Sequence, residues 1–338
     1  MSHDRCEPSL QDRWDWRGFG AVRPPCGLSI VTTMYRSAGY IDEFYRRMTE
    51  AAGQLTQDFE LIFVNDGSPD PSLEKAKTYA HDPRVVIVDL SRNYGHHQAF
   101  MAGLSHARGR KVFFMDVDLE EQPEWILEFD RDLQEKDADV VYGVQEKRVG
   151  SLGRVVSGSL FYKLFNAISD IAIPVNPCTV RMMTRGYANA LLELRDRNLF
   201  LAGNYAWLGF RQVPRPVNKI PRRSASNYSL VKMFLLFVNA VTSFSTYPLK
   251  AVFFLGLAIS CTSLLFGCYI ALDKLLHPDA VLLGWSSLMA SLWFVAGVII
   301  FAQGLIGIYV AKIFDEVKHK PPYVVRRVYF HKTQQEER

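Results

Sequence analysis

The first half of the chain alternates short apolar runs with longer amphipathic segments. The apolar runs, rich in β-branched and aromatic residues, cover residues 28–33, 60–65, 84–90, 111–115 and 139–144. The segments between them, with apolar residues at helical spacing, include residues 40–55, 72–81, 98–107 and 123–136. Strands that alternate with helices at this spacing are typical of βαβ units. The pattern therefore predicts an α/β domain with a mainly parallel sheet.

Two long uncharged segments dominate the last third of the chain. Residues 251–272 carry no charged side chain, and neither do residues 280–311. Since about 20 apolar residues of helix cross a bilayer core, we expect two transmembrane spans, at about 251–272 and 284–311. The sequence between them is too short for a domain, so the spans should form a hairpin. The alternative is a pair of helices buried in a soluble core, which rarely run this long without a charge.

The net charge of +4 is unevenly distributed. No Asp or Glu occurs between Asn198 and Leu272, and residues 312–338 carry seven Lys and Arg against four acids. Because positive charge collects on the cytosolic side of spans, we expect both termini and the α/β domain in the cytosol, on a multi-pass protein of the inner (plasma) membrane. The anionic partner of the basic stretch is then the lipid bilayer, and no nucleic acid is expected. The five cysteines form no CxxC pair and are interpreted as reduced thiols.

Shifts in composition predict the domain limits. Residues 229–246 carry one charge and a helical apolar rhythm broken by polar residues, so we expect a helix lying in the membrane interface rather than a third span. The predicted parts are a loose extension at 1–26, an α/β domain at 27–228, the interfacial amphipathic helix at 229–247, the transmembrane hairpin at 248–311 and a cytosolic basic tail at 312–338.

Acidic residues follow the fourth predicted strand in the stretch FFMDVDLEEQPE. In sheets of this kind ligands bind outside the carboxyl ends of the strands. Asp116 and Asp118 are one residue apart there, and two such carboxylates can hold Mg²⁺ or Mn²⁺ together with a diphosphate. The alternative is that Asp116 only caps a turn. Neither GxGxxG nor GxxxxGK[ST] occurs, so a phosphate must be bound in another way.

The acidic residues after Asp118 and two histidines can be explained mainly by their positions at helix starts. Glu121 and Glu124 are expected to face water at the start of the helix that begins near Pro123, where the helix dipole favours acids. Glu120 can belong either to the metal site or to that helix start, and both assignments stay open. His96 and His97 are interpreted as helix-start residues without a role in the site.

Several ordered segments point to a family. They are IFVNDGSPD, LSRNYGHHQAFMAGLSHARG, MDVDLEEQPE, RRSASNYS, TSFSTYPL and GLIGIYVAKIFDEVKHKPPYVV. The chain resembles, over about residues 27–325, the GT-A glycosyltransferases of family 2, and within them the polyprenyl-phosphate glycosyltransferases related to dolichol-phosphate mannose synthase. The bacterial type carries two C-terminal transmembrane helices. The resemblance implies a Rossmann-like GT-A fold and metal-dependent, inverting transfer of one sugar from a nucleotide-diphosphate sugar to a polyprenyl (undecaprenyl or dolichyl) phosphate on the cytosolic leaflet.

The resemblance also implies roles for individual residues. Asp66 would contact the nucleotide base, with Thr33 and Tyr35 lining the same pocket, while Asp116 and Asp118 would serve as the catalytic pair that binds the metal and the diphosphate. Glu120 stands where Gln is common and is a third candidate for the metal. The usual Pro-x-Tyr-Asn-Glu is replaced by residues 33–37, TMYRS, which leaves the identity of the base open.

A second departure concerns the general base. Some members have Gly-Asp-Phe-Arg where this chain has residues 178–181, CTVR, so Thr179 replaces the Asp. A lipid monophosphate, whose second pKa is about 6, is already an anion and needs positioning rather than a base. Arginine suits phosphate because its fork matches two oxygens, although any one arginine here can also be a surface charge that faces lipid headgroups. The candidates for the acceptor phosphate are Arg154, Ser157, Arg181, Arg222, Arg223, Ser226 and Tyr228.

Two rival functions are weighed against this one. A processive polysaccharide synthase needs a channel that two spans cannot form, and no Gln-x-x-Arg-Trp motif occurs. A catalytically silent scaffold or flippase partner would not need Asp66, Asp116 and Asp118. Glycines at 256, 297, 304 and 307 would allow the spans to pack in a homo-oligomer.

Overall fold

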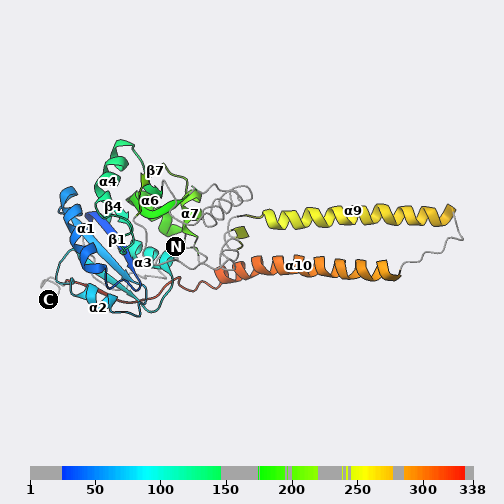
Figure 1. The fold of residues 1–338 in the computed structure, drawn as a ribbon, viewed down its shortest axis with the longest axis horizontal. Helices are drawn as coiled ribbons and strands as arrows, with labels where there is room; N and C mark the ends of the chain where they lie inside the picture. Colours follow the sequence, from blue (N-terminus) through cyan, green and yellow to red (C-terminus); the bar gives the residue numbers. More distant parts are fainter. Residues whose placement is uncertain are drawn as a thin grey trace, which may run out of the picture.

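The computed structural model describes residues 25–145, 174, 176–194, 196, 200–219, 238, 241–242, 245–276 and 285–331. Within them, eight strands form one sheet in the order β7-β5-β6-β4-β1-β2-β3-β8 (Figure 1). Four parallel strands make its centre: β4 (Gly109–Phe114), β1 (Cys26–Met34), β2 (Phe59–Asn65) and β3 (Val85–Leu90). The prediction of a mainly parallel α/β sheet is thus confirmed.

Both sides of this parallel centre are extended by strands that change direction. On one side, β6 (Pro177–Thr184) runs antiparallel to β4 and to β5 (Val140–Gln145), and β7 (Gln212–Val217) runs parallel to β5. On the other side, β8 (Val325–Phe330) pairs antiparallel with β3. The predicted C-terminal tail therefore contains a strand of the catalytic domain's own sheet.

Helices cover both faces of the sheet and give a three-layer arrangement (Figure 1). One face packs on α1 (Ile41–Leu55), α2 (Ser72–Lys77) and α4 (Trp125–Glu135), and the other on α3 (His96–His106), α6 (Arg185–Glu193) and α7 (Leu201–Trp207). Successive strand residues point to opposite faces, so Ile30 belongs to the first apolar core and Val31 to the second. This burial on both faces explains why the strands read as continuous apolar runs.

Two long helices follow the sheet domain and lie side by side (Figure 1). They are α9 (Tyr247–Leu276) and α10 (Trp285–Val317), and the Tyr309 hydroxyl of α10 donates to the Ser245 carbonyl just before α9, at 2.8 Å. Among the described residues, one stretch, Ser291–Val317, is long and apolar enough to cross a membrane, while the apolar stretch Tyr247–Ile259 is shorter. The two-span hairpin accordingly stays a prediction. Most of the predicted interfacial helix at 229–247 lies outside the described residues.

Candidate active site

The carboxyl ends of β1 and β4 bring three polar side chains together. Thr33 comes from β1, Asp116 follows β4, and His96 is the first residue of α3. The Nδ1 atom of His96 lies 3.2 Å from the Thr33 hydroxyl and 3.3 Å from Oδ1 of Asp116, and the hydroxyl donates to the same carboxylate at 3.4 Å. His96 is a helix-start residue as expected, but the structure also places it in contact with Thr33 and Asp116, which the local sequence did not indicate because the contact depends on the strand order.

Burial changes the ionisation of these groups. The Asp116 side chain keeps only 27% of its exposed surface, and burial raises its pKa to about 6, with Asp118 adding to the effect. Burial also lowers the pKa of His96, which favours the neutral ring. A neutral imidazole can accept a hydrogen bond at one nitrogen and donate at the other.

The loop after β4 holds the second carboxylate of the predicted pair. Oδ1 of Asp118 accepts the backbone N–H of Glu120 at 3.2 Å, and Leu119 between them takes a left-handed conformation with φ of 60°. Left-handed backbone at a non-glycine residue costs about 1 kcal/mol or more and is often found at functional sites. The turn directly after the carboxylate pair is therefore fixed by the side chain of Asp118.

The donor atoms suit a hard divalent ion that arrives with its substrate. In the described part of the chain no group of three or more His, Cys, Asp and Glu is placed to hold a metal. Mg²⁺, however, is usually bound by one or two carboxylates together with substrate phosphates and water. Asp116 and Asp118 supply the carboxylate oxygens, so the residues fit such an ion, and Glu120 stays an untested third candidate.

Asp66 is buried at the end of β2 and braces the loop that leads to α3. Its side chain is only 3% exposed, and its two oxygens accept the backbone N–H groups of Tyr94 at 2.7 Å and Gly95 at 3.0 Å. Gly67 follows with φ of 58°, and a Cβ there would lie 2.4 Å from the carbonyl carbon of Arg92. The geometry therefore assigns Asp66 a part in positioning His96, and its predicted contact with a nucleotide base stays untested.

The prediction for Glu121 differs most clearly from the structure. The side chain was expected to face water, yet it is 0% exposed. Its Oε1 atom accepts from the Lys219 ammonium at 2.8 Å and from the backbone N–H groups of Thr179 at 3.1 Å and Val180 at 3.3 Å. Glu124, in contrast, is exposed as expected and pairs with Arg47 of α1.

A cavity of about 450 Å³ lies beside these carboxylates, between β5, β6 and α7. His96 and Thr179 line the end near Asp116, and aromatic side chains such as Phe114, Tyr142 and Tyr205 line its walls. The cavity also contains Arg181, which is 5% exposed.

Arg181 is held inside this cavity without an acidic partner among the described residues. Its guanidinium donates to the carbonyls of Thr179 at 3.2 Å and Cys178 at 3.3 Å, and its centre lies 3.5 Å from the ring centroid of Tyr205. A buried cation whose contacts within the described part of the chain are carbonyls and a π face is well suited to an anionic ligand.

The structure says less about the other predicted site residues. Tyr35 is exposed after β1, with the Arg36 guanidinium 5.6 Å from its ring. Six candidates for the acceptor phosphate lie outside the described residues: Arg154, Ser157, Arg222, Arg223, Ser226 and Tyr228.

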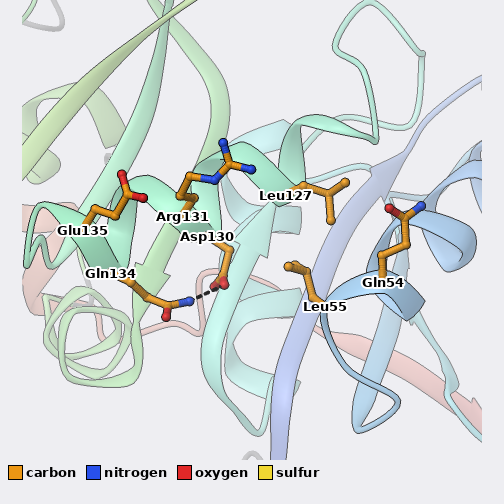
Figure 2. Close-up of a pocket in the computed structure, with 7 residues that line it drawn as sticks. All are labelled: Gln54, Leu55, Leu127, Asp130, Arg131, Gln134 and Glu135. Carbon is orange, nitrogen blue, oxygen red and sulfur yellow. Dashed lines mark hydrogen bonds between the residues drawn. The ribbon is translucent and has the colours of Figure 1, made fainter.

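A second hollow, of about 390 Å³, lies between α1 and α4 (Figure 2). Gln54 and Leu55 face it from the last turn of α1, and Asp130 and Gln134, which are hydrogen-bonded, from α4. Because α1 and α4 begin at the carboxyl edge of the sheet, the ends of these helices lie at the opposite edge. The hollow is therefore separate from the carboxylate site.

Sequence reasoning missed His96, Lys219 and Tyr205. His96 follows the end of β3 closely, and the polar residues at the other strand ends were a usable signal for it. Lys219 and Tyr205 had no local signal, because their partners Glu121 and Arg181 come from distant parts of the chain.

Comparison with known proteins gives consistent matches. Residues 29–192 match the family model described as glycosyl transferase family 2. An uncharacterized glycosyltransferase of Bacillus subtilis (strain 168) is 36% identical, with 89% of this chain and 94% of that protein covered. A bactoprenol glucosyl transferase of Shigella phage SfV is 33% identical, with 88% and 98% covered.

A solved structure, glucosyl-3-phosphoglycerate synthase from Mycobacterium tuberculosis, is 20% identical with a TM-score of 0.45. It covers 64% of this chain and 78% of that one.

Proposed function

Because this chain belongs to glycosyltransferase family 2, we propose that it transfers one sugar from a nucleotide-diphosphate sugar to a polyprenyl phosphate, in a metal-dependent reaction that inverts the anomeric centre. The observation that carries the proposal is the carboxylate pair Asp116 and Asp118 at the end of β4, next to a cavity that contains the buried cation of Arg181. Relatives named bactoprenol glucosyl transferases, similar over nearly their whole length, support the lipid acceptor.

The reaction is a direct displacement. A phosphate oxygen of the lipid attacks the anomeric carbon of the sugar, a new carbon–oxygen bond forms on one face, and the bond to the nucleoside diphosphate breaks on the other. No proton has to be removed, because the attacking oxygen is already anionic at neutral pH. Thr179 can thus stand where some family members have an Asp.

The residues of the chain have separate tasks in this scheme. Asp116 and Asp118 would hold the divalent cation, and a cation bound there neutralises the negative charge on the departing diphosphate. Thr33 and His96 fix the Asp116 carboxylate through their contacts at 3.4 Å and 3.3 Å. Arg181 binds the lipid phosphate in the cavity, where burial strengthens the attraction between opposite charges.

Helices α9 and α10 are proposed to cross the membrane as a hairpin. Their central residues, 251–272 and 285–311, carry no charged side chains, and the exposed surface of α10 is rich in aromatic and aliphatic residues such as Trp293, Phe294 and Phe301. The catalytic domain then lies on the cytosolic leaflet, as the charge distribution predicts.

The test is a transfer assay with a panel of donors. Purified full-length protein in detergent, undecaprenyl phosphate and Mn²⁺ are combined with UDP- and GDP-sugars, and lipid-linked monosaccharide is measured by mass spectrometry. We expect one donor class to give product that disappears with EDTA. Absence of product with every donor would reject the proposal and favour a silent scaffold.

A further inference from the structure

The ion pair between Glu121 and Lys219 lies in the site but has no part in the scheme above. We propose that Lys219 is a phosphate-binding residue of the active site and that the buried carboxylate of Glu121 positions it. The proposal rests on the proposed function, since it names a further residue for the same transfer.

The side chain of Glu121 is buried and is held in place by several hydrogen bonds. Its Oε1 atom accepts three hydrogen bonds, from the Lys219 ammonium and from the backbone N–H groups of Thr179 and Val180 at the start of β6. Its Oε2 atom is also buried and has no hydrogen-bond partner among the described residues. Burying a carboxylate costs several kcal/mol even when it is paired, so a salt bridge in this position is poorly explained by stability alone.

Lys219, in contrast, remains accessible. Its side chain keeps 22% of its surface exposed, and an ammonium has three N–H donors, of which one goes to Glu121. Burial lowers its pKa, but the Glu121 carboxylate outweighs burial and raises the pKa overall, so the ammonium stays charged. The other charged groups that act on it include Asp116, the first carboxylate of the metal pair.

Lys219 is therefore close both to Glu121 and to the carboxylate pair proposed for the metal. The N–H donors of its ammonium that are not directed at Glu121 can meet a phosphate next to a cation held by that pair. Lysine binds phosphate as a point charge without a fixed fork, which suits a group whose position changes during transfer.

Two phosphates meet in this site: the diphosphate of the donor and the monophosphate of the lipid acceptor. The experiment separates them with four variants of the full-length protein in detergent, K219M, K219R, E121Q and E121Q/K219M. Binding of UDP or GDP with Mn²⁺ is measured by calorimetry, using the nucleotide of the donor identified by the panel. The KM for undecaprenyl phosphate is measured in the transfer assay.

The expected result is a loss of about 10- to 100-fold in K219M in one of the two quantities, because a hydrogen bond to a charged group is lost. A loss in nucleotide affinity assigns Lys219 to the donor, and a rise in the acceptor KM assigns it to the lipid phosphate. K219R should recover most of the loss, and E121Q should lose less than K219M because the ammonium remains but is less well placed. K111M is the matched control, since Lys111 forms a comparable pair with Asp130 at the other end of β4.

K219M alone leaves the Glu121 carboxylate buried without its partner and can unfold for that reason. The double variant E121Q/K219M has no such unpaired charge and therefore separates loss of folding from loss of phosphate binding. If the double variant melts like the wild type and has wild-type nucleotide affinity and acceptor KM, the proposal for Lys219 is overturned. A wild-type protein that binds no nucleoside diphosphate would instead overturn the proposed function, and this inference with it.

Discussion

The Nδ1 atom of His96 lies 3.3 Å from Oδ1 of Asp116 and 3.2 Å from the Thr33 hydroxyl. One imidazole thus joins the end of β1 to the loop after β4, and its own position depends on the turn that Asp66 braces through Tyr94 and Gly95. The orientation of Asp116, the carboxylate proposed to bind the metal, is therefore set by residues outside the proposed metal pair. Such supporting contacts typically change activity or metal affinity 10- to 100-fold when they are removed.

The first prediction concerns this contact. His96→Ala should lower kcat by about 10- to 100-fold and weaken Mn²⁺ binding, because Asp116 loses the ring that orients it. Transfer kinetics and Mn²⁺ titration followed by electron paramagnetic resonance measure the two effects. His81→Ala, on the exposed turn after α2, is the control and should behave as wild type. Wild-type kinetics in His96→Ala would show that the contact has no role.

The second prediction concerns the metal pair. Asp118→Ala should reduce turnover by at least about 100-fold, because the departing diphosphate loses several kcal/mol of charge stabilisation. The melting temperature should change little, since the residue lies in a surface loop beyond β4. Activity within tenfold of wild type would contradict the assignment of Asp118 to the metal.

The third prediction concerns the missing base. Thr179→Ala should slow transfer by less than about tenfold, because an anionic phosphate attacks without losing a proton. The rate should also stay nearly constant between about pH 7 and 9, where the lipid phosphate is fully ionised. A fall of several orders of magnitude in Thr179→Ala would mean that the hydroxyl takes part in the chemistry.

The fourth prediction concerns stability and pH. The Asp70 carboxylate accepts hydrogen bonds from the hydroxyls of Ser68 and Ser72 and from the N–H of Ala38. Burial raises the pKa of Asp70, but these bonds outweigh it and hold the pKa at about 2. Since the unfolded value is about 3.9, the stabilisation is present above about pH 4 and is lost as the pH falls towards 2.

Asp70→Asn should therefore cost about 1 kcal/mol at pH 7, after allowance for solvent screening, and lower the melting temperature by a few degrees. The difference from wild type should shrink as the pH falls below about 4. Glu74→Gln, which removes an exposed pair with Lys77, is the control and should have little effect. A deficit that stays constant down to pH 3 would contradict the role of the charge.

The fifth prediction concerns the edge of the sheet. Val328 of β8 is paired with Val88 of β3, and Val328→Pro removes a backbone donor and fixes φ. We expect faster hydrogen exchange of the β3 amides in this variant, measured by mass spectrometry. Unchanged protection of β3 would show that β8 contributes no stability to the sheet.

Regular elements buried on the sheet were well predicted, because apolar periodicity records burial directly. The five predicted strands and four predicted helices are all present, with ends that mostly differ by one or two residues. The second helix is the exception: α2 ends at Lys77, because backbone bonds from Tyr79 to Ala76 and from Ala80 to Lys77 continue the chain as tighter turns.

The strands at the sheet margins were missed for physical reasons. Strand β7 contains Pro214 and Pro216, which argue against a strand by local rules but are tolerated at an edge that pairs on one side only. Strand β8 carries Arg326 and Arg327, charges that protect an edge from unwanted pairing. Local signals therefore described the centre of the sheet better than its borders.

The sequence located Thr33 and Asp116 correctly at the ends of neighbouring strands, where the structure brings them into contact, and their roles stay predictions. The environment of a side chain was mispredicted where it depends on partners that are distant in the sequence. Glu121 has every local feature of a helix-start acid, yet Lys219, which comes from beyond β7, and the backbone of β6 draw it into the interior. Tertiary contacts of this kind leave no trace in the spacing of neighbouring residues.

The strand β8 has a mechanical consequence for the two long helices. The chain leaves the sheet domain before Tyr247 and rejoins its sheet at Val325, so the α9–α10 pair is attached to the domain at both of its ends. A body tethered at one point can swivel about three axes, whereas a body tethered at two points turns only about the line that joins them. The two connections therefore restrict rotation of the catalytic domain about the long axis of the helices more than a single connection would.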